Sequence, residues 1–391
     1  MDLSTTIWPV FLFLLGASTG SFLNVVVYRL PREKSIVKPG SHCTSCQKPI
    51  AWYDNIPIVA WFYLRGKCRH CGAVFSIRYP LVELFTALLF VIVYWAYFSL
   101  KIRHGLPPFT AGGWVIYSGH MILLAALLAS SLIDAEHWII PLSVSYTAVA
   151  VAMILSAIWP YVLSDQTGQY WRIIPYTSIQ TAALALGSVL GLVLSFVCLK
   201  LGWITRSFAE VIEAEKEARR KNVEPPEIPI HIRSEMIREL AFLAPILLTA
   251  LLAWQLLTGP NALAQHWETF IQGQKWAAGL LGSVYGFMIG AGVVWATRIL
   301  GSLAFGREAM GLGDVHLMGA VGAMLGWASP VIAFFAAPFI ALSWALTRLI
   351  LQRTREIPYG PFLSVATLAV MMLHDAIIAY FERVLTPPPM P

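Results

Sequence analysis

Charge is scarce in this chain. Only 12% of its 391 residues are charged and 58% are hydrophobic, a composition that excludes an ordinary soluble domain. The net charge of +6 is not gathered into a basic stripe with interleaved aromatic residues, so no nucleic-acid partner is expected. No glycine-rich nucleotide loop follows a predicted strand. Cysteine is also rare, with five residues in all, and four of them fall in one polar loop.

Long apolar runs dominate what is present. A helix of about 20 apolar residues spans a bilayer. The first run lacks a basic leading region and a small-residue cleavage site, so we interpret it as a retained span rather than a signal peptide. We predict an all-α polytopic membrane protein with about 8–10 transmembrane helices. The candidate spans are 5–28, 80–100, 113–133, 139–163, 176–204, 238–258, 276–300, 315–328, 329–350 and 361–382.

Lys and Arg in the loops predict the orientation of the chain. Loop 29–79 carries nine basic residues against only Glu33 and Asp54, so we expect it to be cytosolic and the N-terminus to lie outside. The predicted organisation is a first transmembrane helix (1–30), a cytosolic four-cysteine loop (31–79), and a helical membrane region (80–391). A cytosolic insertion at about 205–238 interrupts that last region.

The insertion is polar and contains no chemical motif. Its stretch "AEVIEAEKEARRK" (209–221) favours a helix, in which Glu215 and Arg219 form an i,i+4 pair. The prolines of "VEPPEIPIHI" (223–232) then end any helix. A solvated hairpin is the favoured interpretation, and an arm that docks a partner is the alternative.

The four clustered cysteines form two pairs, "CTSC" (43–46) and "CRHC" (68–71). Two CxxC turns at this spacing are typical of a zinc ribbon, in which four thiolates complete a tetrahedron around one ion. We predict that Cys43, Cys46, Cys68 and Cys71 bind a structural Zn²⁺; four free or redox-active thiols are the alternative. A site closed by four sulfurs leaves no position for chemistry, and cytosolic placement disfavours disulfides.

Two aspartates lie at the ends of predicted spans. Asp134 is in "SSLIDAEHWIIP" (130–141) and Asp314 is in "GLGD" (311–314), both on the predicted cytosolic side. An acidic residue at membrane depth is a functional hypothesis by default. Two carboxylates that share a site cannot both ionise easily, which suits an aspartic protease. The alternative for each aspartate alone is a residue that caps a helix at the membrane interface.

Further motifs carry a resemblance to a known family. They are "GSFLNVVVYRLP" (20–31), the two cysteine pairs, "DNIPIVAW" (54–61), "IRYPLVELFTALLF" (77–90), "GLGDVHLMGAVGAMLGW" (311–327) and "IPYGPFLSVA" (357–366). In this order they resemble the bacterial prepilin peptidases, bifunctional leader peptidases and N-methyltransferases that belong to the GxGD intramembrane aspartic proteases. The resemblance is dense over residues 20–90 and covers about a third of the chain.

The resemblance implies roles for particular residues. It makes Asp134 and Asp314 the catalytic pair and the four cysteines zinc ligands. It associates the region of about 15–100 with methyl transfer, which implies S-adenosylmethionine as a cofactor and Glu83 as a residue of that activity. It also implies prepilin or pseudopilin substrates, and pilus or secretion assembly machinery as further partners. The protein would lie in the bacterial inner membrane with its active site facing the cytosol.

Three features depart from the family pattern. Thr44 replaces the proline that usually follows the first cysteine, and His316 replaces the lysine that usually lies two residues after GxGD. The 180 residues between Asp134 and Asp314 are many more than usual. We predict a prepilin leader peptidase that also N-methylates the new N-terminus. The alternatives are a peptidase without methyltransferase activity and a transporter that uses the aspartates as an ion site.

Overall fold

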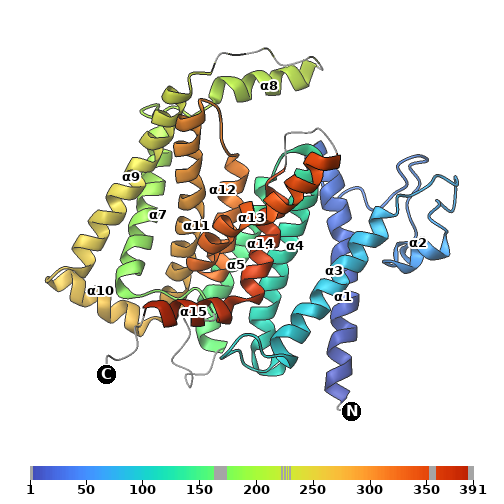
Figure 1. The fold of residues 1–391 in the computed structure, drawn as a ribbon, viewed down its shortest axis with the longest axis horizontal. Helices are drawn as coiled ribbons and strands as arrows, with labels where there is room; N and C mark the ends of the chain where they lie inside the picture. Colours follow the sequence, from blue (N-terminus) through green and yellow to red (C-terminus); the bar gives the residue numbers. More distant parts are fainter. Residues whose placement is uncertain are drawn as a thin grey trace. The chain divides into compact units, whose positions relative to one another are not determined.

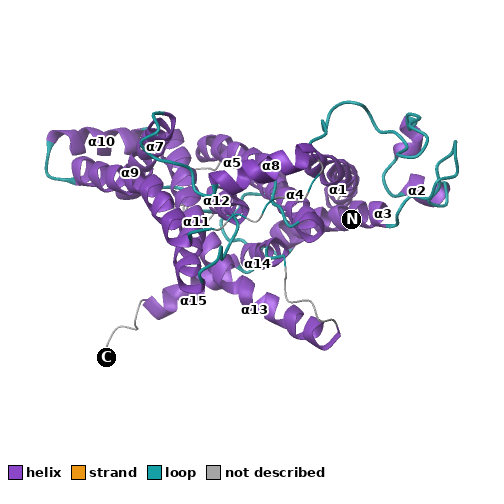
Figure 2. Cartoon of the chain, turned by 90° about the horizontal axis from the view of Figure 1, so that it is seen from above, coloured by secondary structure: helices purple, strands orange, loops and turns teal. Residues whose placement is uncertain are grey.

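The computed structural model describes residues 3–162, 174–221, 230–351 and 358–385, together with Val223, Pro226 and Ile228. These residues form helices and loops, with no strand among them (Figure 2). Two isolated β-bridges, His42 with Pro49 and Lys67 with Val74, are the extended pairings in that part of the chain. The all-α prediction is therefore confirmed.

The chain divides into two compact units, residues 1–148 with 332–391, and residues 149–331. The first unit contains α1 (Leu3–Arg29), α2 (Val59–Tyr63), α3 (Arg78–Tyr94), α4 (Gly113–His137), α14 (Gly360–Met372) and α15 (His374–Leu385). The second contains α7 (Ile179–Lys200), α8 (Ala209–Lys221), α9 (Ile232–Thr258), α10 (Ala262–Gly273), α11 (Lys275–Phe305) and α12 (Leu312–Leu325). Two helices, α5 (Leu142–Val162) and α13 (Ala328–Leu351), have residues in both units.

Among the described residues, seven helices are long and apolar enough to cross a membrane. The number becomes eight if α14 and α15, which meet at a 72° bend, form one span. This is the lower end of the predicted range. The spans predicted at 315–328 and 329–350 correspond to α12 and α13. At about 1.5 Å per residue, the 14 residues of α12 are too short for a bilayer core of about 30 Å.

In the first unit, α1 and α3 pack closely (Figure 1). Gly16 and Gly20 are four residues apart and lie against the backbone of α3. A Cβ atom would come within 2.8 Å of the Cα of Ala87 at Gly16, and within 2.7 Å of the Cα of Glu83 at Gly20. Small residues at this spacing let two membrane helices approach closely, so this pair fixes where Glu83 lies.

In the second unit, α7 packs along α9 and α11 packs along α12 (Figure 1). Gly286 and Gly322 face each other, and a Cβ on either would come within 2.0 Å of the other's carbonyl oxygen. Gly319 allows a similarly close approach, because a Cβ there would meet the ring of Phe287. Gly326 instead ends α12 at a φ of +85°, and a Cβ there would meet only the Cα of Pro175, at 3.9 Å.

A buried residue, Phe208, lies near the start of the insertion. A loop leads from α7 to Phe208, whose side chain packs with Met236 and Ile299 in a hydrophobic cluster. The helix predicted at 209–221 is α8, and α9 begins only at Ile232, after the proline-rich stretch. Among the described side chains of α8, Glu210, Glu213 and Glu217 are exposed, as a solvated arm requires. The side chains of Glu215 and Arg219 lie outside the described residues.

Candidate active site and metal centre

Asp134 lies near the end of α4 and is buried, with 7% of its surface exposed. Its Oδ2 atom accepts a hydrogen bond of 2.9 Å from the backbone N–H of Gly360. Gly360 is the first residue of α14, so the carboxylate faces the positive end of a helix. This contact favours negative charge on Asp134.

Gly360, which the sequence showed only as part of "IPYGPF", lies directly against Asp134. A Cβ atom at this residue would lie 2.8 Å from Oδ2 of Asp134 and 3.3 Å from its carboxyl carbon. Because Cβ atoms essentially never come so close, Asp134 could keep this position only beside a glycine. The neighbouring Ser131 and Ser364 strengthen the α4–α14 contact with a hydrogen bond of 2.7 Å between their hydroxyls.

Asp314 is in the first turn of α12 and is 8% exposed. The preceding Gly311 caps this helix with ordinary extended dihedrals, a φ of −73° and a ψ of 149°. A Cβ at Gly311 would meet nothing closer than Asp314 Oδ2, at 3.6 Å. Neither packing nor backbone conformation within the fold therefore requires a glycine here, and the side of the helix start next to Asp314 is left open.

The departure at His316 has a local explanation. Its Nδ1 atom lies 2.7 Å from the carbonyl oxygen of Leu312, one turn earlier in α12. The imidazole therefore contacts the backbone of its own helix.

The two aspartates lie in different compact units. Asp134 belongs to the first unit and Asp314 to the second.

The four cysteines form two similar turns. In the first, the N–H of Cys43 donates to Lys48 O and the N–H of Gln47 donates to Cys43 O. In the second, the N–H of Cys68 donates to Ala73 O and the N–H of Gly72 donates to Cys68 O. The residue after each second cysteine has a left-handed backbone, with φ of +58° at Gln47 and +72° at Gly72. Each turn thus aims two sulfurs at one point.

The sulfurs of Cys43, Cys46, Cys68 and Cys71 all lie within 4.8 Å of one another. The distance between the sulfurs of Cys43 and Cys71 is 3.8 Å. A tetrahedral zinc site with Zn–S bonds of about 2.3 Å has sulfurs about 3.8 Å apart. The cluster therefore has a size that could hold one metal ion. It is the only group of three or more potential ligands that meets this criterion in the described part of the chain.

The thiols differ in acidity. The backbone N–H groups of Cys46 and Ser45 lower the pKa of Cys43 to about 6. The N–H of Ala73 favours the Cys71 thiolate, but burial and the neighbouring sulfurs together raise the pKa of Cys71 to about 11. Four thiolates so close together repel one another unless a cation neutralises them, so the cluster favours a bound metal.

An ion pair links the second cysteine turn to the segment before α2. The guanidinium of Arg69 donates two hydrogen bonds to Asp54, with Nε at 2.7 Å from Oδ2 and Nη2 at 2.5 Å from Oδ1. Hydrogen bonding to Arg69 holds the pKa of the Asp54 carboxyl below its usual value. Two parallel bonds of this kind fix orientation as well as distance.

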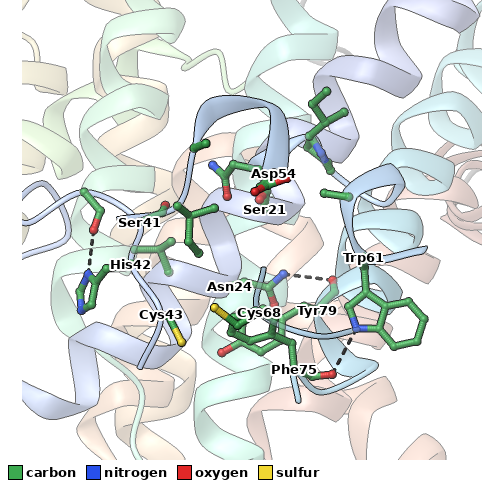
Figure 3. Close-up of a pocket in the computed structure, with 18 of the residues that line it drawn as sticks. Ser21, Asn24, Ser41, His42, Cys43, Asp54, Trp61, Cys68, Phe75 and Tyr79 are labelled. Atoms are coloured by element: carbon green, nitrogen blue, oxygen red, sulfur yellow. Dashed lines mark hydrogen bonds between the residues drawn. The ribbon is translucent and has the colours of Figure 1, made fainter. Parts of the chain in front are cut away.

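A cavity of about 580 Å³ lies between α1, the start of α3 and the four-cysteine loop (Figure 3). Ser21, Asn24 and Tyr79 lie on its helical side, and Cys43, Asp54 and Trp61 line it from the loop. The side-chain amide of Asn24 donates to the carbonyl oxygen of Tyr79 at 3.1 Å, which joins α1 to α3. The size of this cavity and its mixture of polar and apolar lining residues are typical of a small-molecule site.

Glu83 also lines this cavity, from α3. It is 8% exposed, and its Oε2 atom accepts a hydrogen bond of 2.7 Å from the N–H of Ile58. Ile58 has a φ of +65°, which a β-branched residue rarely adopts. The glutamate thus holds "DNIPIVAW" in a strained conformation, a type of strain that is concentrated at functional sites.

Comparisons with known proteins agree with this arrangement. Residues 14–97 match the model of the bacterial peptidase A24 N-terminal domain, and residues 247–346 match the type IV leader peptidase family. The first match contains the cavity, Glu83 and all four cysteines, and the second contains Asp314. Asp134 lies outside both. No solved structure matches the chain significantly.

Several curated relatives share these segments. A prepilin leader peptidase/N-methyltransferase of Myxococcus xanthus is 42% identical over 151 residues, which are 38% of this chain and 41% of the relative. One from Klebsiella pneumoniae is 39% identical over 34% of this chain and 56% of the relative. One from Aeromonas salmonicida is 23% identical over 94% of this chain and 92% of the relative. The chain thus spans about half the length of the Myxococcus and Klebsiella relatives.

The chain is therefore similar to the bacterial peptidase A24 N-terminal domain over residues 14–97 and to the type IV leader peptidase family over residues 247–346. The seven candidate spans among the described residues are those expected of a multi-pass membrane protein.

Proposed function

We propose that the chain is a prepilin leader peptidase, an aspartic endopeptidase whose catalytic pair is Asp134 and Asp314. The observation that carries the proposal is that both aspartates are buried at the ends of helices, where the family's GxGD pattern and Gly360 accompany them. The substrates would be type IV prepilins or the pseudopilins of type II secretion. Cleavage would occur on the cytosolic side of the membrane, because the loop 29–79 is rich in Lys and Arg.

In this mechanism one aspartate is ionised and the other is protonated, since two nearby carboxylates resist double ionisation. The ionised carboxylate takes a proton from water, which attacks the scissile carbonyl. The protonated carboxyl donates a hydrogen bond to the carbonyl oxygen. The open side of the α12 start at Gly311 gives an extended substrate a path to Asp314.

We further propose that the cavity beside the cysteine loop serves N-methylation of the new N-terminus. S-adenosylmethionine would supply the methyl group, and the cavity is large enough for such a ligand. The carboxylate of Glu83 would favour a cationic ligand and the amino group of the peptide. Asn24 and Trp61 would orient them, and Glu83 would hold the loop in place through Ile58.

The four cysteines would hold a structural Zn²⁺. A closed set of four sulfurs suits zinc and leaves no open position for substrate. The zinc ion would stabilise the loop that forms one wall of the cavity, and it would take part in neither reaction.

One experiment tests both activities. A prepilin is co-expressed with the enzyme, and the mass of its N-terminal peptide is measured. The wild-type enzyme should yield a peptide without leader that carries one methyl group. Asp134→Asn and Asp314→Asn should each leave the leader in place, because asparagine cannot act as a base.

Glu83→Gln separates the two activities. Glutamine still accepts the bond from Ile58 but carries no charge, so we expect a cleaved and unmethylated peptide. Leader removal by a membrane-inserted Asp314→Asn variant would refute the peptidase proposal. A normally methylated peptide from the Glu83→Gln variant would refute the role of Glu83. If the wild-type product is always cleaved and never methylated, the enzyme is a peptidase without methyltransferase activity.

A further inference from the structure

Arg298 is the most deeply buried arginine or lysine among the described residues, with 1% of its surface exposed. It lies on α11, about two turns before the end of that helix at Phe305. Its Nε atom donates to both carboxylate oxygens of Glu239 on α9, at 3.0 and 3.3 Å. Glu239 is itself 2% exposed and accepts a third bond, of 2.8 Å, from the indole of Trp295. The pair is therefore fully enclosed within the second unit.

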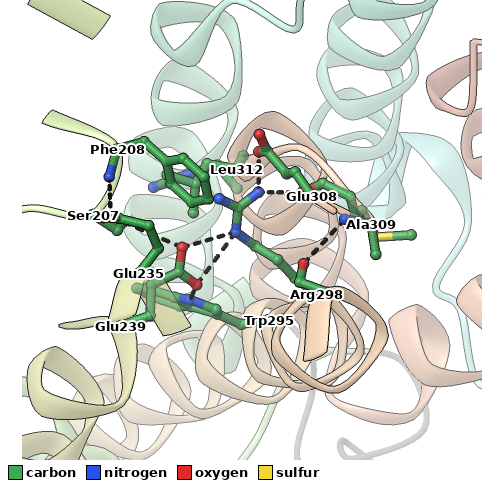
Figure 4. Close-up of polar contacts among 12 residues, drawn as sticks. Ser207, Phe208, Glu235, Glu239, Trp295, Arg298, Glu308, Ala309 and Leu312 are labelled. Atoms are coloured by element: carbon green, nitrogen blue, oxygen red, sulfur yellow. Dashed lines mark hydrogen bonds and ion pairs between the residues drawn. The ribbon is translucent and has the colours of Figure 1, made fainter. Parts of the chain in front are cut away.

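The other end of the guanidinium reaches the segment that carries the GxGD motif. Nη1 donates to the carboxylate of Glu308 and to the carbonyl oxygen of Met310 (Figure 4). Met310 immediately precedes Gly311, which caps α12, and Asp314 follows in the first turn of that helix. One side chain therefore ties the start of α12 to α9 and α11. A further bond, from the N–H of Ala309 to the hydroxyl of Ser302, holds the same segment to α11 at 3.0 Å.

The base of the insertion belongs to the same cluster. The hydroxyl of Ser207 donates to Glu239 at 3.2 Å, and the ring of Phe208 lies 5.3 Å from the guanidinium carbon of Arg298. The N–H of Phe208 donates to Glu235 at 2.5 Å, so residues on both sides of the arm are joined where it leaves the membrane helices (Figure 4). The arm itself extends away from this base as α8.

We propose that Arg298 is a positioning residue for Asp314, and that Ser207 and Phe208 of the insertion hold Arg298 in place. The proposal rests on the proposed peptidase function. A buried ion pair adds little net stability compared with apolar packing, because both charges must be desolvated. Its geometric effect here is specific, since it fixes the backbone four residues before Asp314. A displacement of about 1 Å at a catalytic group can cost about 100-fold in rate.

Glu308→Gln is the cleanest test, because Glu308 is half-exposed and its loss leaves no buried charge unpaired at that position. We expect it to lower kcat for prepilin cleavage about 10-fold and to leave KM unchanged. Arg307→Gln is the matched control, since Arg307 is exposed on the same segment, and it should retain wild-type kcat. Arg298→Lys keeps the charge but lacks the fork of donors, and it should lower kcat about 100-fold.

A readout independent of activity accompanies the kinetics. Amide hydrogen exchange across residues 309–314 should become faster in Glu308→Gln and Arg298→Lys, while exchange in α7 and the thermal midpoint stay near the wild-type values. Asp314→Asn tests the chemistry separately. If that variant cleaves normally, the peptidase proposal fails, and exchange alone still decides whether Arg298 orders this segment.

Two changes within the insertion separate the role of its base from that of the rest of the arm. Replacing 211–230 by a short Gly/Ser linker retains Ser207 and Phe208 and should leave kcat within about twofold, because loop closure depends weakly on length. Phe208→Ala should lower kcat more than this deletion does. The proposal is overturned if Glu308→Gln and Arg298→Lys keep wild-type kcat and exchange. It is also overturned if every loss of kcat simply follows a loss of thermal stability, or if Arg307→Gln has the same effect as Glu308→Gln.

Discussion

The cysteine loop and helix α12 are stabilised in opposite ways. Between residues 41 and 77 only Cys43, Ala60, Gly66 and Cys68 are buried, whereas eleven of the 14 residues of α12 are buried. The loop has too little apolar burial to order its backbone and depends on paired cysteine turns and the Asp54–Arg69 bridge. Helix α12 depends on packing so close that backbone meets backbone at Gly286 and Gly322. Removal of the metal should therefore affect the cysteine loop, whereas a glycine-to-alanine substitution should affect the packing of α12.

Metal removal should produce the largest effect in this comparison. A structural zinc contributes on the order of 10 kcal/mol to a small domain, so a strong chelator or Cys43→Ser should unfold the loop. Methylation should be lost, and the helices should keep their thermal midpoint. Metal content, limited proteolysis and the pilin's N-terminal mass measure this, with Cys198→Ser on α7 as the control. Purified protein that contains no zinc under reducing conditions would contradict the prediction.

Gly360→Ala should have the next largest effect. The new methyl group would come within 2.8 Å of Asp134 Oδ2, so the carboxylate must move away from the N–H at the start of α14. We expect kcat for prepilin cleavage to fall about 100-fold. Gly292→Ala is the matched control, because a Cβ there meets nothing within 4 Å. Equal kcat for the two variants would show that the Gly360 contact does not position Asp134.

Gly322→Ala should damage packing rather than chemistry. Its methyl group would lie 2.0 Å from the carbonyl oxygen of Gly286, so α11 and α12 must separate. Overpacking of this kind typically costs about 1–3 kcal/mol. We expect a lower thermal midpoint with the zinc content unchanged, which is the reverse of the chelator result. A midpoint equal to that of Gly292→Ala would contradict it.

Asp54→Asn should have the smallest effect, and that effect depends on pH. Arg69 lowers the pKa of the folded Asp54 carboxyl, so the bridge stabilises the loop above the ordinary aspartate pKa of about 4. This stabilisation is lost as the pH falls through the lowered pKa. Protease resistance of the loop should therefore differ between wild type and variant by a constant amount from about pH 5.5 to 8. A difference that changes within that range would point to another titrating group.

The sequence alone predicted much of this protein because the relevant signals are local. Apolar runs long enough to span a membrane gave the helices their approximate bounds, and the short spacing within each CxxC pair indicated turns that aim two sulfurs at one point. Asp134 and Asp314 were prominent because acids are rare at membrane depth. Phe208 was missed, since one aromatic residue at the edge of a charged arm carries no periodic signal.

Only the tertiary structure decided which distant groups meet. Gly360 and Asp134 are 226 residues apart, and Arg298 and Glu239 are 59 apart. Each of these hydrogen bonds depends on how one helix packs against another, and no sequence period encodes such a contact. The bend between α14 and α15 and the short length of α12 were hidden for a similar reason. Apolar composition predicts that a segment is buried, whereas side-chain packing and capping glycines determine where each helix ends.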